Sequence, residues 1–285
     1  QKTVVIAGYK RSPFHFANKG GLAGVRPDTM AATVIKELVE STKINPNEIQ
    51  DLILGNAFPE AEQGFNMARN VVFLAGLPVS IAGVTLNRFC ASSMTAIHLA
   101  AGYLHIGAGD AYIAAGVESM SRVPMGGYNP MPNPKLKQDY PQAYISMGRT
   151  AENLANKHSI SREDQDKFAL NSHKKAAAAQ DNGKFDDEIV DIENVSKDGC
   201  IRGDTDLEKL GGLKPAFDKD GSVTPGSSSP LTDGAAAVLV TTEDFAKSNN
   251  LEIFAKIRSV AVAGCAAEIM GIGPVKKKKK ALQWA

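Results

Sequence analysis

The sequence predicts a layered α/β fold, and three features of its pattern support that class. Short segments rich in Val and Ile alternate with segments whose apolar residues recur at the helical period. Such alternation is typical of a mostly parallel sheet with helices packed on it. The strand segments are apolar without interruption, which indicates a sheet covered on both faces. We therefore expect a layered α/β/α arrangement.

The first 120 residues contain most of the expected strands and helices. Val, Ile and Leu mark the strands, because these residues favour an extended backbone. Asp28 is expected to cap the first helix, whose apolar residues follow a period of 3.6. The expected elements are a strand at 2–7, a helix at 28–41, a strand at 51–56, a helix at 66–74, a strand at 81–86, a helix at 95–106 and a strand at 111–116.

From about residue 121 the composition changes to that of an insertion. Five prolines lie between positions 123 and 144, beside two adjacent glycines, as in a loop. Ser161 and Asp164 resemble a capping box, and the helix that they open should stop at Asn182-Gly183. After an irregular stretch at 200–229, strand character returns at 238–240 and 254–262. We therefore expect a first domain at 1–120 and 233–272, interrupted by an inserted domain at 121–232.

Bulk composition excludes several classes of protein. The 285 residues are 43% hydrophobic and 22% charged, which is ordinary for a soluble globular chain. The net charge of +1 gives no support to a nucleic-acid partner, and the five lysines at 276–280 are expected to form a solvated helix face or a terminal tail. The three cysteines show no C-x-x-C spacing, so we expect neither a disulfide framework nor a metal site. No apolar run reaches the length of a membrane span.

Cys90 is the candidate nucleophile. It lies between the expected strand at 81–86 and the expected helix at 95–106. The first N–H groups of a helix lack internal partners and the helix dipole is positive there, so a thiolate is stabilised at such a turn. The alternative is a buried structural cysteine, the usual role of an unpaired Cys.

No histidine of the sequence is well placed as a general base. A base must lie within about 3 Å of the thiol, directly or through one water. His98 follows eight residues later on the same expected helix, hence roughly 12 Å along its axis, and His105 is farther. His15 is expected to be structural, and His158 and His173 fall on inserted helices as surface residues.

The segment Asn87-Arg88-Phe89-Cys90-Ala91-Ser92-Ser93-Met94 resembles the nucleophile motif of thiolases, which cleave or form the carbon–carbon bond of 3-ketoacyl-CoA. Ala91 departs from the glycine that usually follows the nucleophile. Further segments resemble the family in the same order: Lys10-Arg11-Ser12-Pro13-Phe14, Glu62 to Asn70, Gly116 to Ser121, Thr150 to Leu154, Lys214 to Asp218, Leu231 to Ala237 and Met270 to Val275.

The resemblance is to the N-terminal portion of a thiolase with its inserted loop domain. Family motifs of the second half, which supply a histidine, a second cysteine and an oxyanion donor, are absent, and residues 273–285 resemble the start of a truncated C-terminal domain. We therefore expect slow turnover from this chain alone. The Cys90 N–H can form one arm of an oxyanion hole, and the resemblance implies that the absent half supplies the other arm.

The resemblance implies a coenzyme A site in the inserted domain. Arg202 matches an arginine near the adenine nucleotide, and Met147, Phe217 and Ser229 match positions along the pantetheine channel. Ser227 stands where the family carries Asn, in a turn that here reads Thr224-Pro225-Gly226-Ser227. The alternative is that Arg202 is a solvated loop residue and Phe217 a local core residue.

The expected function is acyl transfer from 3-ketoacyl-CoA through a Cys90 acyl-enzyme, with coenzyme A as co-substrate and no permanently bound cofactor. Ser146-Met147 and the segment Glu62–Asn70 favour the degradative over the biosynthetic, acetoacetyl-CoA-forming direction. Two further alternatives are a non-catalytic acyl-CoA or lipid carrier and an assembly fragment. We expect a homodimer or a dimer of dimers in the cytoplasm, with mitochondria and peroxisomes as alternative locations.

Overall fold

The structure is a computed structural model that describes residues 2–285, and the chain divides into two compact units. The first unit consists of three segments: the chain up to Asn129, then Phe185–Cys200, and then Leu231–Arg258. The second takes Pro130–Lys184, Ile201–Pro230 and Ser259–Ala285. The domain boundaries inferred from composition stay a prediction.

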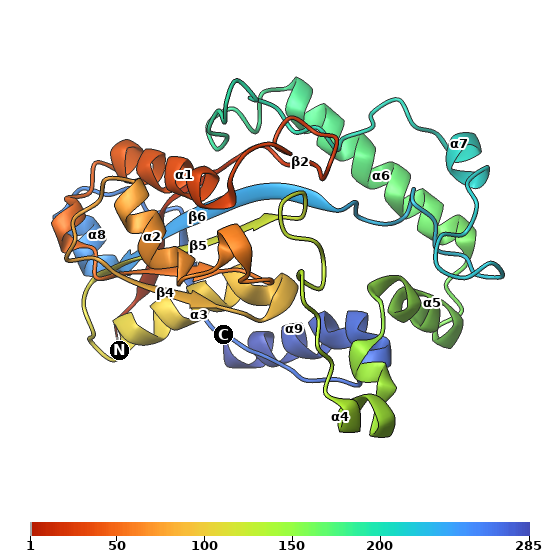
Figure 1. Ribbon diagram of the computed structural model, residues 1–285. Helices are drawn as coiled ribbons and strands as arrows, with labels where there is room; N and C mark the ends of the chain where they lie inside the picture. Colours follow the sequence, from red (N-terminus) through yellow and green to blue (C-terminus); the bar gives the residue numbers. More distant parts are fainter. Residues whose placement is uncertain (1) are drawn as a thin grey trace. The chain divides into compact units, whose positions relative to one another are not determined.

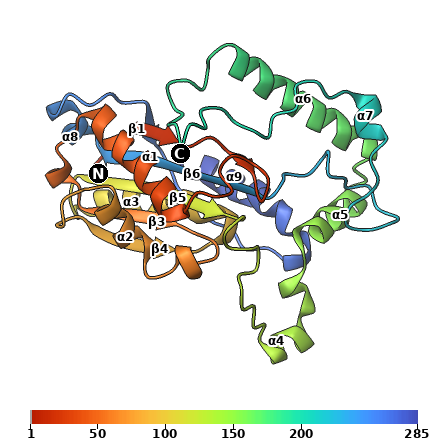
Figure 2. The same ribbon diagram turned by 45° about the horizontal axis from the view of Figure 1, so that its top comes forward.

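The first unit is built on one sheet, whose order is β4-β3-β5-β6-β1-β7 with β2 beside β6. The order of β4, β3 and β5 can be followed in Figure 2. The strands are β1 (Val4–Arg11), β2 (His15–Phe16), β3 (Asp51–Gly55), β4 (Ala82–Leu86), β5 (Ala111–Ser119), β6 (Thr232–Thr242) and β7 (Ala255–Ile257).

The sheet is mixed, so the expectation of a mostly parallel sheet was wrong. β3 pairs in parallel with β4 and β5, whereas β6 runs antiparallel to both β5 and β1. The reason is the insertion: Ser119 at the end of β5 pairs with Asp233 at the start of β6, so the chain returns at the edge where it left. A return to the same edge places the next strand antiparallel.

Helices cover both faces of this sheet, which confirms the α/β/α class. α1 (Pro27–Thr42) and α2 (Met67–Leu74) lie on one face and α3 (Ser92–His105) on the other (Figure 1). Successive strand residues point to opposite faces. Leu52 and Leu54 therefore join the core under α1 and α2, and Ile53 joins the core under α3. The remaining helix of this unit is α8 (Glu243–Ser248), and its 3₁₀ turns are η1 (Pro46–Glu48), η2 (Ala61–Gln63) and η3 (Phe89–Ala91).

Two expected boundaries differ from the structure. Arg26, not Asp28, is the N-cap of α1; Pro27 occupies the first helical position, and Asp28 lies in the first turn, where it accepts from the Thr29 N–H. The expected strand at 254–262 is limited to β7, which pairs with β1 from Ile6 back to Val4. Because β1 starts at Val4, β7 has no partner beyond Ile257.

The second unit is helical. Ser161 caps its longest helix, since its hydroxyl accepts from the Asp164 N–H, which confirms the N-cap. The Asp164 carboxylate accepts from the Ser161 hydroxyl and not from the Ser161 N–H, so the second bond of a capping box is replaced. The helices are α4 (Pro134–Asp139), α5 (Met147–Lys157), α6 (Arg162–Asp181), α7 (Leu207–Gly211) and α9 (Gly273–Trp284), with 3₁₀ turns η4 (Pro141–Tyr144) and η5 (Ala267–Ile272). None of the helices within residues 2–285 combines the length and apolar character that crossing a membrane requires.

Candidate active site

Cys90 lies in the turn between β4 and α3, as the sequence predicted. The turn is η3, and α3 begins two residues after the cysteine. Phe89, directly before Cys90, has φ +46°, in the left-handed region that residues with a β-carbon rarely adopt. A strained residue beside a candidate nucleophile is a common feature of functional sites.

Side chains on both sides of Phe89 hold this turn. Asn87 Oδ1 accepts from the Phe89 N–H at 2.7 Å, and Asn87 Nδ2 donates to the Ala57 carbonyl at 2.9 Å. The buried Ser92 hydroxyl accepts from the Arg88 N–H at 2.7 Å and donates to the Phe89 carbonyl at 2.6 Å. The backbone around Cys90 is thus fixed by hydrogen bonds rather than by burial.

Two glycines of the sheet let the start of α3 lie directly against it. A β-carbon on Gly55, at the end of β3, would come within 2.5 Å of the Ser93 nitrogen. One on Gly116 of β5 would come within 2.6 Å of the Ser93 β-carbon. The absence of these two β-carbons therefore sets the depth at which the Cys90 turn lies on the sheet.

Cys90 is the most accessible of the three thiols. It is exposed, whereas Cys200 and Cys265 are half-buried. Cys200 Sγ lies 3.7 Å from the Phe14 carbonyl, and Cys265 Sγ lies 3.7 Å from the Met270 carbonyl. Among the residues that the structure describes, none accepts a hydrogen bond from the Cys90 N–H. That N–H is therefore available to an oxygen atom of a ligand.

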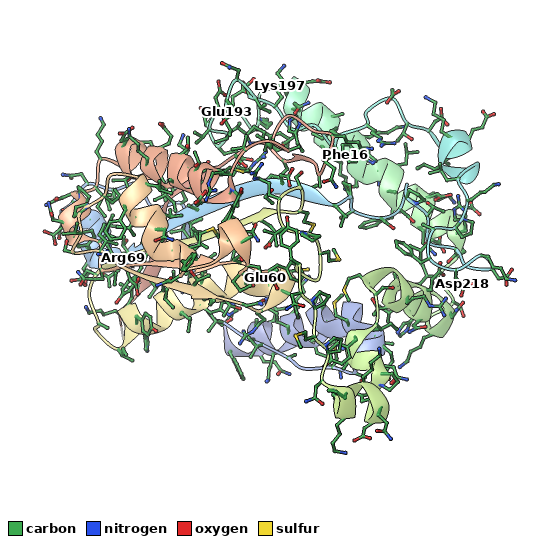
Figure 3. The ribbon with its side chains drawn as sticks, viewed as in Figure 1. Phe16, Glu60, Arg69, Glu193, Lys197 and Asp218 are labelled. Carbon is green, nitrogen blue, oxygen red and sulfur yellow. The ribbon has the colours of Figure 1, made fainter. Side chains whose placement is uncertain are left out.

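His15 has a structural role, as expected. Its Nδ1 accepts a hydrogen bond from the Gly21 N–H at 3.1 Å, so the ring proton is on Nε2. Nε2 donates to the carbonyl of Lys197, labelled in Figure 3, at 2.8 Å. His98 lies within α3, eight positions after Cys90. The described part of the chain places no histidine in a hydrogen bond with the Cys90 thiol.

A half-buried carboxylate lies at the same edge of the sheet. Glu118 of β5 accepts hydrogen bonds from the Ala57 N–H at 2.8 Å, from Gln63 Nε2 at 2.9 Å and from Asn56 Nδ2 at 3.3 Å. Burial raises the pKa of Glu118 above its usual value, against the opposing effect of these donors. Asn56 is buried, and its Oδ1 has no partner among the described residues.

Asn56 and Gln63, but not Glu118, line a groove of about 410 Å³ that reaches Asn87 at the start of the Cys90 turn. Its lining includes the polar residues Asn56, Gln63 and Asn87 and the apolar residues Phe65 and Val84. The Phe58 and Phe89 rings lie 5.9 Å apart in the same region. Arg69 of α2, labelled in Figure 3, donates to the carbonyls of Val79 and Ile81 and so holds the segment that leads into β4. The volume of the groove leaves room for an acyl group or a side chain of another molecule.

The second unit contains the residues expected to bind coenzyme A. Met147 opens α5, and the next residue, Gly148, lies against the Phe217 ring so closely that a β-carbon would be 2.1 Å from it. Asp218 (Figure 3) follows Phe217 and pairs with Arg149. Met147 and Phe217 are each about 40% exposed (43% and 42%). The structure therefore brings these two apolar side chains to one part of the surface.

Ser227, Ser229 and Arg202 occupy two other places in this unit. Ser227 closes a turn on the buried Thr224, whose N–H donates to its hydroxyl at 3.1 Å, and Ser229 is exposed just after it. Arg202 is exposed, and its N–H donates to Nδ1 of His173 on α6. The segment after Phe217 instead meets α6 near its start, where Gln165 donates to Ser222. His173 follows Gln165 by eight residues, so Arg202 lies roughly 12 Å along α6 from that contact.

Sequence reasoning missed four polar residues near the Cys90 turn: the buried Asn56 and Gln63, the half-buried Glu118 and the exposed Asn87. Pairing between β3 and β5 brings Asn56 beside Glu118, and no local pattern reveals that pairing. Only Asn87 left a local signal, because an Asn two residues before a backbone N–H can close a turn with it. No group of three or more metal-binding side chains occurs within residues 2–285.

Comparison with known proteins agrees with this arrangement. Residues 4–244 match the family model described as the thiolase N-terminal domain. A 3-ketoacyl-CoA thiolase of Bacillus subtilis is 45% identical over 301 residues, covering 100% of this chain and 77% of that protein. One of Shewanella frigidimarina is 46% identical over 292 residues, covering 99% of this chain and 75% of that protein. The similarity thus extends along the whole chain and includes the Cys90 turn.

Proposed function

Because this chain belongs to the thiolase family of acyltransferases, we propose that it transfers acyl groups through a thioester on Cys90. The observation that carries the proposal is the exposed Cys90 in a strained turn that leads into α3. The relatives are named 3-ketoacyl-CoA thiolases, which makes a 3-ketoacyl-CoA the proposed substrate.

The proposed reaction has two steps. The Cys90 thiolate attacks the 3-keto carbon, and the bond between carbons 2 and 3 breaks. The two-carbon fragment leaves with the bonding electrons and takes a proton, which gives acetyl-CoA. The thiolate of free coenzyme A then attacks the acyl-enzyme, so that a shortened acyl-CoA leaves and the Cys90 thiolate is restored. The free N–H of Cys90 supports this scheme, since it can donate to the oxyanion formed in each step.

We assign coenzyme A binding to the second unit, through Met147, Arg202, Phe217, Ser227 and Ser229. The exposed pair of Met147 and Phe217 suits the apolar parts of pantetheine. The Arg202 guanidinium suits a phosphate or an adenine ring. Ser146 before Met147 favours the degradative direction over acetoacetyl-CoA synthesis.

We also propose that the protein forms a homodimer through β4. In the described sheet this strand pairs on one side only, with β3, so its other edge carries unpaired backbone groups. Val84 on that strand and Phe65 beside it are exposed, the latter at 95%. An unpaired, apolar strand edge favours pairing with another chain.

The nucleophile is tested by limited alkylation. Native protein is treated with limiting iodoacetamide at neutral pH, and adducts are mapped by mass spectrometry. We expect Cys90 to be labelled first, because it is exposed and the other two thiols are half-buried. Preferential labelling of Cys200 or Cys265 would contradict the assignment.

Acyl transfer itself is followed by the loss of the 3-ketoacyl-CoA enolate absorbance in the presence of coenzyme A. We expect any thiolysis to disappear in Cys90→Ser. Thiolysis that persists in this variant would disprove the acyl-enzyme. A protein that binds coenzyme A without Cys90-dependent thiolysis would instead be a carrier, and one that binds none would have a role in assembly.

A further inference from the structure

We propose that Asn87 is a positioning residue, whose side-chain amide holds the turn that presents the thiol and the N–H of Cys90. This inference rests on the proposed role of Cys90 as the nucleophile. Asn87 itself is three residues before Cys90 and has its amide bonded at both ends within the first unit.

The turn needs an external constraint because of Phe89. Its φ of +46° is unfavourable for a residue with a β-carbon, and such a conformation persists only where surrounding contacts impose it. Packing is a weak constraint here, since Phe89 is 62% exposed and its ring meets Phe58 only at a tilted 5.9 Å contact. Hydrogen bonds to the backbone on either side of Phe89 must therefore impose the conformation.

Asn87 supplies the bond on the N-terminal side. Its Oδ1 accepts from the Phe89 N–H at 2.7 Å, two residues along the chain, which is the geometry of an Asx turn. Its Nδ2 donates to the Ala57 carbonyl at 2.9 Å, on the segment after β3. The two bonds use the acceptor and a donor of one planar amide, so fixing Ala57 fixes the orientation of the oxygen that holds Phe89.

Ala57 is in turn fixed to the sheet. Its N–H donates to Glu118 Oε2 at 2.8 Å, and Glu118 is held in β5 by a further bond from Gln63. The hydrogen-bonded chain therefore runs from β5 through Glu118, Ala57 and Asn87 to Phe89. Ser92 closes the other side by accepting from the Arg88 N–H and donating to the Phe89 carbonyl.

The consequence concerns Cys90, because the backbone of Phe89 orients the peptide that carries the Cys90 N–H. If Phe89 relaxes to a negative φ, that N–H and the Cys90 β-carbon both turn away from their present directions. The thiol is then no longer held near the N-terminus of α3. Removal of the Asn87 amide should therefore lower the reactivity of Cys90 while the rest of the unit stays folded.

The experiment compares substitutions of Asn87 with a matched control at Asn45. Asn87→Leu removes both hydrogen bonds at similar size, and Asn87→Ser keeps an oxygen that can accept from the N–H two residues on. Asn45→Leu is the control, because Asn45 Oδ1 accepts from the Asn47 N–H at 3.1 Å in the same type of turn, next to η1. The rate constant for iodoacetamide at each cysteine is measured by peptide mass spectrometry, together with the midpoint of unfolding.

We expect Asn87→Leu to slow alkylation of Cys90 roughly tenfold and to leave the rates at Cys200 and Cys265 unchanged. Asn87→Ser should stay within roughly threefold of the wild type, and Asn45→Leu should not change the Cys90 rate. If Asn87→Leu does not fold, Asn87→Ala carries the same expectation, because it removes both bonds without adding bulk.

A wild-type rate at Cys90 in the folded Asn87→Leu or Asn87→Ala variant would overturn the inference. So would an equal loss in Asn45→Leu, which would show a general effect on stability. Failure of the proposed function looks different: the wild-type protein itself would then label at Cys200 or Cys265 before Cys90.

Discussion

At the scale of single residues, a half-buried cluster of charged side chains joins two segments of the first unit. The Arg11 guanidinium binds both carboxylate oxygens of Asp198, at 2.8 and 2.9 Å, and also binds Glu188. Asp198 Oδ1 accepts from the Phe14 N–H as well. Bidentate pairs of this kind are among the strong hydrogen bonds in proteins. They tie the segment 185–200 to the end of β1.

Asp198→Asn should destabilise the protein in a pH-dependent way. Burial alone would raise the pKa of Asp198, but the bonds from Arg11 and from the Phe14 N–H outweigh burial and hold that pKa below its usual value. A lowered carboxylate pKa stabilises the fold fully above the unfolded-state pKa of about 3.9, and that contribution is lost as pH falls through the folded-state pKa. We expect a loss of about 1–3 kcal/mol at pH 7.

Urea unfolding of both proteins between pH 7 and pH 3 measures this effect. The difference between wild type and Asp198→Asn should be constant down to about pH 5 and should shrink below about pH 4. Glu40→Gln is the control, since its pair with Lys36 is exposed on α1 and should contribute little at any pH. A difference that grows on acidification would contradict the role assigned to the Arg11–Asp198 pair.

Arg202→Ala tests the coenzyme A assignment at a single residue. A charged hydrogen bond to phosphate is worth about 1.5–3 kcal/mol, so affinity should fall tenfold or more. Isothermal titration calorimetry with coenzyme A gives the dissociation constants. Lys137→Ala on α4 removes the same charge elsewhere in the second unit and should leave affinity unchanged. Equal affinity of Arg202→Ala and wild type would remove Arg202 from the proposed site.

At the scale of elements, the contact of α3 with β3 and β5 determines where the Cys90 turn lies. The small residues Gly55, Gly116 and Ser93 meet at this contact. α3 buries Ala96, Ala100 and Leu104 against the sheet further along its length. The helix is therefore held at its start by close backbone approach and along its length by apolar packing.

Gly55→Ala, at the end of β3, should disturb the contact between α3 and the sheet. Gly102→Ala, within α3, should not. The added β-carbon at 55 meets the backbone nitrogen of Ser93 and cannot be accommodated by a side-chain rotation, so we expect about 1–3 kcal/mol of destabilisation. At Gly102 nothing lies within 4 Å, and Ala should stabilise the helix by about 0.5–1 kcal/mol.

The measurements are the free energy of unfolding and the alkylation rate of Cys90. We expect Gly55→Ala to lower both, and Gly102→Ala to raise the first and leave the second unchanged. A Gly55→Ala protein with wild-type stability and wild-type Cys90 reactivity would mean that α3 can shift without cost, and would reject the close-contact argument.

At the scale of the whole molecule, the sheet orders its strands so that β4 lies at one end. None of its residues is fully buried: each is exposed or half-buried. The strand pairs in parallel with β3 and lines part of the candidate site. A strand at the edge of a sheet usually carries a charge or a proline that prevents further pairing. β4 reads Ala-Gly-Val-Thr-Leu and carries neither.

Val84→Lys should therefore weaken the proposed dimer. A lysine on the strand edge opposes pairing with a second chain, and sedimentation velocity at micromolar concentration should show a shift from twice the chain mass to the chain mass. Val79→Lys is the control, because Val79 is more exposed but lies outside β4. A wild-type protein that sediments as a monomer would refute the dimer, and an unchanged dimer in Val84→Lys would place its interface elsewhere.

Sequence and structure agree where local rules decide the outcome. The N-cap at Ser161, the stop at Gly183 with φ +67°, and the strand before the Cys90 turn all follow from residues close together in the chain. The prediction from sequence and the structure disagree where segments distant in the chain meet. β6 is antiparallel because an insertion returns the chain to the edge where β5 ended, and no residue of β6 encodes that direction by itself.

By itself the sequence determined the α/β/α class, the turn that carries Cys90 and the family resemblance, because apolar period, turn residues and motif order are local properties. The tertiary structure decided what surrounds the cysteine. Glu118, Asn56 and Gln63 reach the Cys90 side of the sheet only because β3 and β5 pair in parallel and end at the same edge. Strand pairing sets such contacts, and it is settled by the packing of the whole unit rather than by neighbouring residues.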